Sequence, residues 1–314
     1  MSRPEAKRLR SLFAVAGLIW LVGLAWLLID RGPASTLATP VLATAAPDLL
    51  LRSGGGTTTV HAGERAFSLS ARSMGLPDRI RFADGDVPFE HPFSSEDGLG
   101  ATHNADGCLG CHVNNGRSPG PDGFVADAGP VLLLGLADGS PHPVLGQQIQ
   151  DRGSDADGLL IVDWLEEPGT YPDGTAFSLR RPVVSVDGAD VTGLVTSLRA
   201  APPVFGGGLL EAISADDLRA MADPDDSDGD GVSGRLQEAT GDDGSPAAGR
   251  FGWKAQHASI LATTRHAFDV DLHLDHDLAA QRFGDDFLDD TAFYTRTVAV
   301  PAIRDRDDPD VRAG

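Results

Sequence analysis

The sequence predicts a mainly α-helical protein with a small inserted antiparallel β element and a single N-terminal transmembrane helix. Three observations lead to this fold. An uncharged, mostly apolar run spans residues 12–29, helical spacing recurs on both sides of the middle of the chain, and short alternating runs separated by Asp-Gly turns fill residues 131–195. With 38 glycines and 21 prolines in 314 residues, we expect long loops and few long helices elsewhere.

The N-terminal run resembles a membrane signal. Its 18 residues would span about 27 Å as a helix, close to the thickness of the bilayer hydrocarbon. Four basic residues precede it: Arg3, Lys7, Arg8 and Arg10. We therefore predict that residues 1–31 form a signal anchor, with 12–29 in the inner membrane and the rest of the chain in the periplasm. A cleaved signal peptide is the alternative, although Ala43-Thr44-Ala45 lies far beyond the run. Residues 32–53 are predicted to be a tether.

The charge excludes one class of partner. The chain has 46 acidic and 25 basic residues, a formal net charge of −21. Such a surface repels phosphate, so we expect no nucleic-acid partner. It suits a periplasmic protein with a basic protein partner.

The chain has only two cysteines, and they lie in Cys108-Leu109-Gly110-Cys111-His112. This C-x-x-C-H predicts covalent attachment of haem c, with thioethers to both thiols and His112 as the iron ligand. A redox or disulfide pair is the alternative, but neither needs the histidine, and zinc would need more ligands. The helical part is then cytochrome c-like. Arg117 follows closely enough to meet a haem propionate.

The remaining elements follow in order along the chain. Residues 64–100 are expected to be irregular to helical. Apolar runs between 131 and 195 predict antiparallel strands with Asp-Gly turns. Helical spacing returns at 209–222, where Ser214 and Asp216 are candidate caps, and again at 254–268. A last apolar stretch covers 294–303.

A second metal signal lies within residues 223–238. Asp226, Asp228 and Asp230 fit the D-x-D-x-D-G start of a calcium loop, and the Val232 carbonyl can add an oxygen ligand. The twelfth position is Gln237, so the bidentate glutamate of an EF-hand is missing. We predict a structural calcium ion, with a solvated acidic turn as the alternative.

Several short motifs together resemble the di-haem oxidoreductase family of cytochrome c peroxidase-like proteins, also labelled thiol oxidoreductases. The likeness runs from about residue 54 to the end of the chain. It rests on motifs that are weak singly and specific in this order: Gly55-Gly56-Thr57-Thr58-Thr59, Arg81-Phe82-Ala83-Asp84-Gly85, Asp97-Gly98-Leu99-Gly100, Asn115-Gly116-Arg117, Gly146-Gln147-Gln148-Ile149-Gln150-Asp151, residues 199–213, the aspartates of 223–230, and Phe251-Gly252-Trp253-Lys254-Ala255.

The resemblance implies two haems and a periplasmic oxidoreductase. A second C-x-x-C-H would follow a stretch like Val298-Ala299-Val300-Pro301-Ala302, and this sequence ends before it. We therefore expect a fragment that lacks the C-terminal haem domain and cannot complete a peroxidase cycle alone, with a truncated single-haem protein as the alternative.

A more distant resemblance, to bacterial di-haem cytochrome c peroxidases, implies roles for two residues. Trp253 takes the position of the tryptophan between the haems, and Asp271 that of the acid–base residue on the distal side. Trp253 as an ordinary core aromatic and Asp271 as a surface acid remain the alternatives. Thr263 stands where a glutamine is expected, and Leu272-His273 replaces a Met-Gly, so the peroxidase pattern is incomplete.

The sequence thus predicts a peroxidase-like haem oxidoreductase. A plain electron-transfer cytochrome and a haem-bearing docking partner remain the alternatives.

Overall fold

The computed structural model describes residues 52–61, 63–119, 130–153 and 160–313. The chain divides into two compact units, 1–46 and 47–314, and all described residues belong to the second. The described helices are α3 (Leu76–Glu90), α4 (Cys108–Cys111), α5 (Gly207–Glu211), α6 (Ala215–Ala220), α7 (Ile260–His266), the π-helix η7 (Ala267–Asp271), α8 (His276–Phe283), α9 (Phe287–Thr297) and α10 (Pro309–Ala313). Short 3-10 turns are η2 (Gly55–Thr57), η3 (Glu64–Phe67), η4 (Ser95–Asp97) and η5 (Val113–Asn115).

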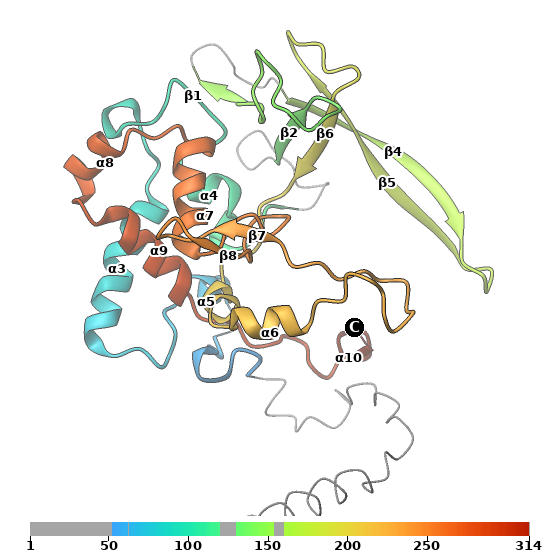
Figure 1. Ribbon diagram of the computed structural model, residues 1–314. Coiled ribbons are helices and arrows are strands. Elements are labelled where there is room, and N and C mark those ends of the chain that lie inside the picture. Colours follow the sequence, from blue (N-terminus) through green and yellow to red (C-terminus); the bar gives the residue numbers. More distant parts are fainter. Residues whose placement is uncertain (1–51, 62, 120–129, 154–159, 314) are drawn as a thin grey trace, which may run out of the picture. The chain divides into compact units, whose positions relative to one another are not determined.

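The described strands form small antiparallel pairs (Figure 1). The pairs are β1 (Thr102–His103) with β3 (Arg152–Gly153), β2 (Val131–Gly135) with β6 (Val195–Arg199), β4 (Leu160–Thr170) with β5 (Ala176–Val186), and β7 (Glu238–Thr240) with β8 (Pro246–Ala248).

The predicted fold class is wrong. The described part of the chain is mixed α/β, because strands occur before, within and after the expected β segment and most helices have only one or two turns. The alternating runs join into strands longer than expected. Two runs on either side of Pro182 form the single strand β5. Proline is tolerated there because both strands of a two-stranded ribbon are edge strands.

The predicted transmembrane helix also finds no support. Among the described residues, no helix has the length and apolar character needed to cross a bilayer. Residues 12–29 lie outside the described residues.

Helices α3 and α9 pack together and form the main helical contact. A Cβ at Gly85 would lie 1.9 Å from the Asp290 carbonyl oxygen, so only glycine permits this approach. Tyr294 is fully buried, with its ring centroid 4.7 Å from Phe82 and 4.9 Å from Phe89. Together with Val204 and Val298 these three aromatic residues form the α3–α9 cluster.

A second apolar cluster lies around the π-helix. Phe268 is its centre, with ring centroids 5.9 Å from Phe93 and 5.7 Å from Phe287. We call this group the η7 cluster; its other buried members are Ala105, Leu272, Leu274, Ala279 and Leu288.

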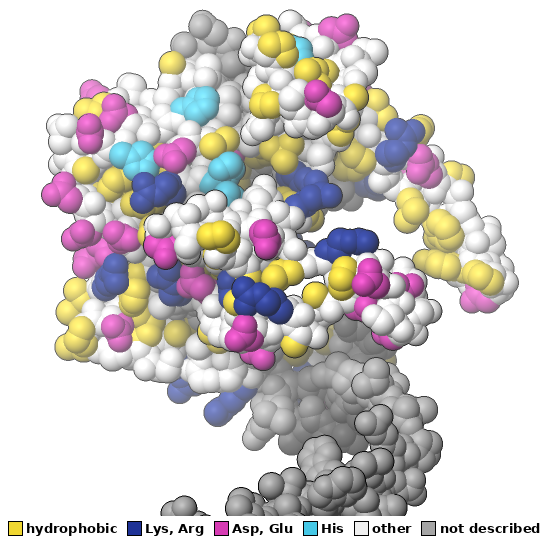
Figure 2. Space-filling view, in the orientation of Figure 1, with side chains coloured by type: hydrophobic (Ala, Val, Ile, Leu, Met, Phe, Trp, Pro, Cys, Tyr) yellow, Lys and Arg dark blue, Asp and Glu magenta, His cyan; other side chains and the backbone are white. Residues whose placement is uncertain are grey.

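The β elements have an apolar core of their own, formed by Leu132, Leu134, Ile149 and Val186. Ile149 belongs to it because its segment runs along β2: Ile149 N–H donates to Leu132 O at 3.0 Å, and Leu134 N–H donates to Gln147 O at 2.9 Å. The β4–β5 ribbon extends beyond this core (Figure 1). In the space-filling view, hydrophobic side chains are visible along the ribbon (Figure 2).

The expected helix at 209–222 is divided into α5 and α6. Ser214 caps α6 by accepting a hydrogen bond from Asp217 N–H, as its residue type predicts. The expected helix at 254–268 begins later, at Ile260, where Ser259 caps α7. It then widens into η7, a form often found at functional sites.

Asp97 anchors the turn that precedes the cysteine motif. It is 5% exposed, and its carboxylate accepts hydrogen bonds from Ser94 Oγ at 2.8 Å and His91 Nε2 at 3.1 Å. Arg282 of α8 lies 3.2 Å away. Hydrogen bonds from His91 and Ser94 lower the pKa of Asp97 to about 2.

We predict that Asp97→Asn lowers the free energy of unfolding by about 1–3 kcal/mol at pH 7, because charged hydrogen bonds are lost in a buried turn. The folded-state pKa of about 2 lies below the ordinary 3.8, so the carboxylate's contribution is present above about pH 4 and is lost as the pH falls toward 2. Denaturant unfolding at several pH values measures this. Asp84→Asn, at an exposed position of α3, is the control. An equal loss in both variants would contradict the anchoring role.

Candidate haem site

Helix α4 begins at Cys108 and ends at Cys111, so the two thiols are three residues apart on one helical turn. Residues at i and i+3 share a face of a helix, so both sulfurs lie on one side. Cys108 contacts both the α3–α9 cluster and the η7 cluster, and Cys111 contacts the η7 cluster. The motif is therefore held at the junction of the two apolar clusters.

Both cysteines are free in the structure. Burial raises the pKa of the Cys108 thiol to about 12. Burial, and then the nearby Asp271 carboxylate, raise the pKa of Cys111 to about 12. Such thiols are protonated at neutral pH, and reactive redox cysteines require the thiolate. This chemistry disfavours the redox-pair alternative.

His112 follows α4 directly and is partly buried. Its Nδ1 donates to the Gly116 carbonyl oxygen at 3.3 Å, and the Pro202 backbone also interacts with the ring. Nε2 would be the ring atom that binds a metal. Burial lowers the pKa of His112, so the imidazole is neutral, the form that binds iron.

The loop after His112 is fixed by buried polar contacts. Asn115 is 3% exposed, has φ +59°, and its Oδ1 accepts from the Tyr294 hydroxyl at 2.7 Å. Ser118 Oγ donates to Cys111 O at 3.0 Å and accepts from Ala201 N–H at 2.9 Å. These bonds join the cysteine motif to α9 and to the end of the β segment.

Arg117 lies in the same loop with an exposed side chain. Among the residues that the structure describes, its guanidinium has no hydrogen-bond or ion-pair partner, so it is available to an anionic group. Its role toward a propionate remains a prediction.

Asp271 ends the π-helix, and it is near enough to the thiols for its charge to contribute to the raised pKa of both cysteines. Its Oδ1 accepts a hydrogen bond from Gln148 Nε2 at 2.7 Å, and its carbonyl oxygen accepts from Asn104 N–H at 2.7 Å. Burial raises the pKa of Asp271, although the Gln148 hydrogen bond lowers it. The residue is thus a partly buried, hydrogen-bonded acid rather than a solvated surface acid; its catalytic role remains a prediction.

Trp253 lies at the surface, with 55% of the residue exposed. Its indole N–H donates to Ala200 O at 2.9 Å, and the Arg199 guanidinium lies 5.2 Å from its ring centroid. The alternative of a core aromatic therefore does not describe it. An anchored, half-exposed indole is able to contact another redox centre, and that role also remains a prediction.

The residues present fit a haem. The thiols, the neutral His112 and the Phe89 ring, whose centroid is 6.3 Å from that of His112, border apolar clusters that can cover a porphyrin. Asn104 Nδ2 is buried without a hydrogen-bond partner among the described residues, so this polar atom is left for a ligand or water.

Sequence reasoning quoted the segment 146–151 as a family motif and missed its contact with Asp271. Gln148 and Asp271 are 123 positions apart. An uncharged amide at a buried strand position carries no local signal of the carboxylate that it meets.

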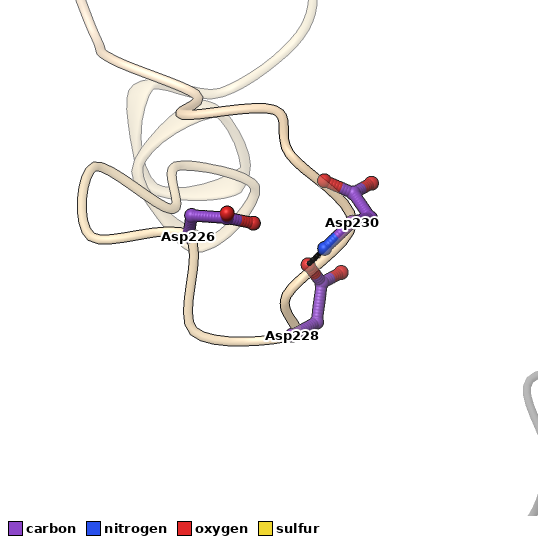
Figure 3. A group of neighbouring side chains, drawn as sticks. All are labelled: Asp226, Asp228 and Asp230. Carbon is purple, nitrogen blue, oxygen red and sulfur yellow. Dashed lines mark hydrogen bonds between the residues drawn. The ribbon is translucent and has the colours of Figure 1, made fainter.

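The acidic loop brings Asp226, Asp228 and Asp230 together, with one oxygen of each within 4.8 Å of the others. Figure 3 shows the Asp226 carboxylate extending across the loop toward the other two. Backbone N–H groups already donate to these carboxylates, including Val232 N–H to Asp230 Oδ1 at 2.7 Å. The loop is exposed, and calcium remains a prediction.

Comparison with protein families gives one match. The model of the family described as "Di-haem oxidoreductase, putative peroxidase" matches residues 146–279, a range that contains Trp253, Asp271 and the acidic loop. The match supports the family predicted from the motifs, over less than half of the chain; the family it names is one of haem-containing oxidoreductases. Comparisons with curated proteins and with solved structures give no match.

We predict that calcium raises the melting temperature, because a ligand that binds only the folded state stabilises it by about 2.7 kcal/mol at 100 times its Kd. Asp228→Asn removes one ligand and should abolish most of this shift. Asp225→Asn, at an exposed acid of the same loop outside the triad, should retain it. Differential scanning calorimetry with calcium, magnesium and chelator makes the comparison; equal shifts in both variants would leave only a solvated acidic turn.

Proposed function

We propose that this protein is a c-type haem oxidoreductase that reduces peroxide outside the cytoplasm. The observation that carries the proposal is that Cys108 and Cys111 pack against the η7 cluster, next to the π-helix that ends at Asp271. Cys108 and Cys111 would attach the haem and His112 would bind its iron, while Asp271 would supply an acid–base group near the attached cofactor.

The reaction consumes one hydrogen peroxide, two electrons and two protons and yields two waters. When bound, the haem supplies the redox centre at which the O–O bond is cleaved. Asp271 would take a proton from one peroxide oxygen and return it to the other, so that the departing oxygen leaves as water. Burial, which raises the pKa of Asp271, supports this role because it moves the group toward the pH at which it can exchange protons.

The electrons must come from a donor of suitable charge. At −21 the chain favours a basic donor, such as a small cytochrome, by long-range attraction. Trp253 is proposed to lie on the path of electron entry, because its ring is half exposed and its indole N–H is fixed to the backbone. A second haem, which the family description implies, is the proposed immediate donor.

Location follows from the attachment chemistry. Covalent haem c is assembled outside the cytoplasm, so we propose a periplasmic site of action. The proposed donor then belongs to the same compartment.

The test is peroxide turnover by the haem-loaded protein with a chemical electron donor. Asp271→Asn should slow turnover at least about tenfold, since positioned acid–base groups contribute roughly 10²–10⁴. Asp269→Asn is the matched control: it lies two residues earlier in η7 and pairs with His276 at 2.8 Å. It should retain turnover within about twofold. Unchanged turnover in Asp271→Asn would refute the acid–base role, and absence of turnover in the unaltered protein would favour an electron-transfer cytochrome.

A further inference from the structure

Gln148 meets Asp271 because of the strand geometry of its segment. The segment pairs along β2, with an antiparallel bridge between Gln148 and Leu133. Side chains alternate along a strand, so Ile149 enters the β core while Gln148 and Gln150 lie on the other face. That face is turned to η7: Gln148 bonds the Asp271 carboxylate, and Gln150 Nε2 donates to Val270 O at 2.9 Å.

The same segment is fixed at its far end. Asp151 N–H donates to Asn104 Oδ1 at 3.1 Å, and Asn104 N–H donates to the Asp271 carbonyl. Beyond it, β3 pairs with β1, the strand that leads into the cysteine motif. Gln148, at 9% exposed, therefore has little freedom to move away from the carboxylate.

We propose that Gln148 is the positioning residue for Asp271, so that the β segment forms one wall of the acid–base site. Its amide holds Oδ1, which fixes the carboxyl group and leaves Oδ2 as the oxygen that exchanges protons. Only the expected effect on turnover rests on the proposed function. The hydrogen bond from Gln148 and its effect on the pKa of Asp271 do not depend on that function.

Several groups act on Asp271 from the surrounding elements. The charges of two histidines, His266 and His273, favour its ionised form. The thiols of Cys108 and Cys111 are also close enough to interact with its charge. Gln148, by contrast, donates a hydrogen bond to the Asp271 carboxylate at 2.7 Å. Removing the Gln148 amide should therefore change the pKa of Asp271 more than removing any one of these neighbouring charges.

The experiment compares Gln148→Leu with Gln147→Leu in the haem-loaded protein. Gln147 is the exposed neighbour, and its side chain makes no hydrogen bond among the described residues. The first readout is the infrared titration of the Asp271 carboxyl group, identified as the band that disappears in Asp271→Asn. Loss of the Gln148 hydrogen bond should raise the pKa of Asp271 by about 1, because a donor to the ionised form is removed. Gln147→Leu should leave it unchanged.

The second readout is a double-mutant cycle on peroxide turnover. Gln148→Leu should lower kcat roughly tenfold with little change in KM. Added to Asp271→Asn, it should cause no further loss, because it acts through that carboxyl group. An unshifted infrared titration, or equal losses in both backgrounds, would overturn the proposal. If the titration shifts while no variant reduces peroxide, the proposed function fails and the positioning contact stands.

Should Gln148→Leu fail to fold, Gln148→Glu replaces it. That variant keeps the length of the side chain and places a second carboxyl group against Asp271, which should raise the pKa of Asp271 further. A pKa equal to that of the unaltered protein would again overturn the proposal.

Discussion

The structure depends on the packing of α4 between the α3–α9 cluster and the η7 cluster. A helix of four residues has no stability of its own, since nucleation costs more than a single turn returns. The thiols and His112 are therefore held in place by the aromatic rings on the two sides of α4. Two hydrogen bonds add to this, from Ser118 to the Cys111 carbonyl and from Tyr294 of α9 to Asn115 in the following loop. Gly85 contributes indirectly to the position of this motif, because it permits the close α3–α9 contact that positions Tyr294.

The site joins segments that are far apart in the chain. The cysteine motif supplies the attachment residues, η7 supplies Asp271, and the β segment supplies Gln148. Each segment contributes a different chemical group: thiols in apolar surroundings, a carboxyl group whose pKa is raised by burial, and an amide whose hydrogen bond lowers that pKa. The widened turn of η7 places the carboxyl group of its last residue toward α4 and the β segment rather than into solvent.

Local patterns in the sequence predicted local features well. The cap at Ser214 and the antiparallel runs on either side of the Asp-Gly turns follow from spacing and residue type. Features that depend on tertiary packing could not be predicted from local sequence patterns. The mainly helical fold class was wrong because adjacent short runs joined into long strands. The surface position of Trp253 could not be predicted from the presence of an aromatic residue in a family motif. The Gln148–Asp271 contact could not be predicted because it joins residues 123 positions apart.

The central proposal is that Cys108, Cys111 and His112 would hold a covalent haem whose iron can react with peroxide, with Asp271 as the acid–base group. Electron paramagnetic resonance of the resting and half-reduced haem-loaded protein, before and after peroxide is added, tests it most directly. We predict a high-spin signal that changes when peroxide is added. A wholly low-spin signal in every state, unaffected by peroxide, would contradict the claim and identify an electron carrier.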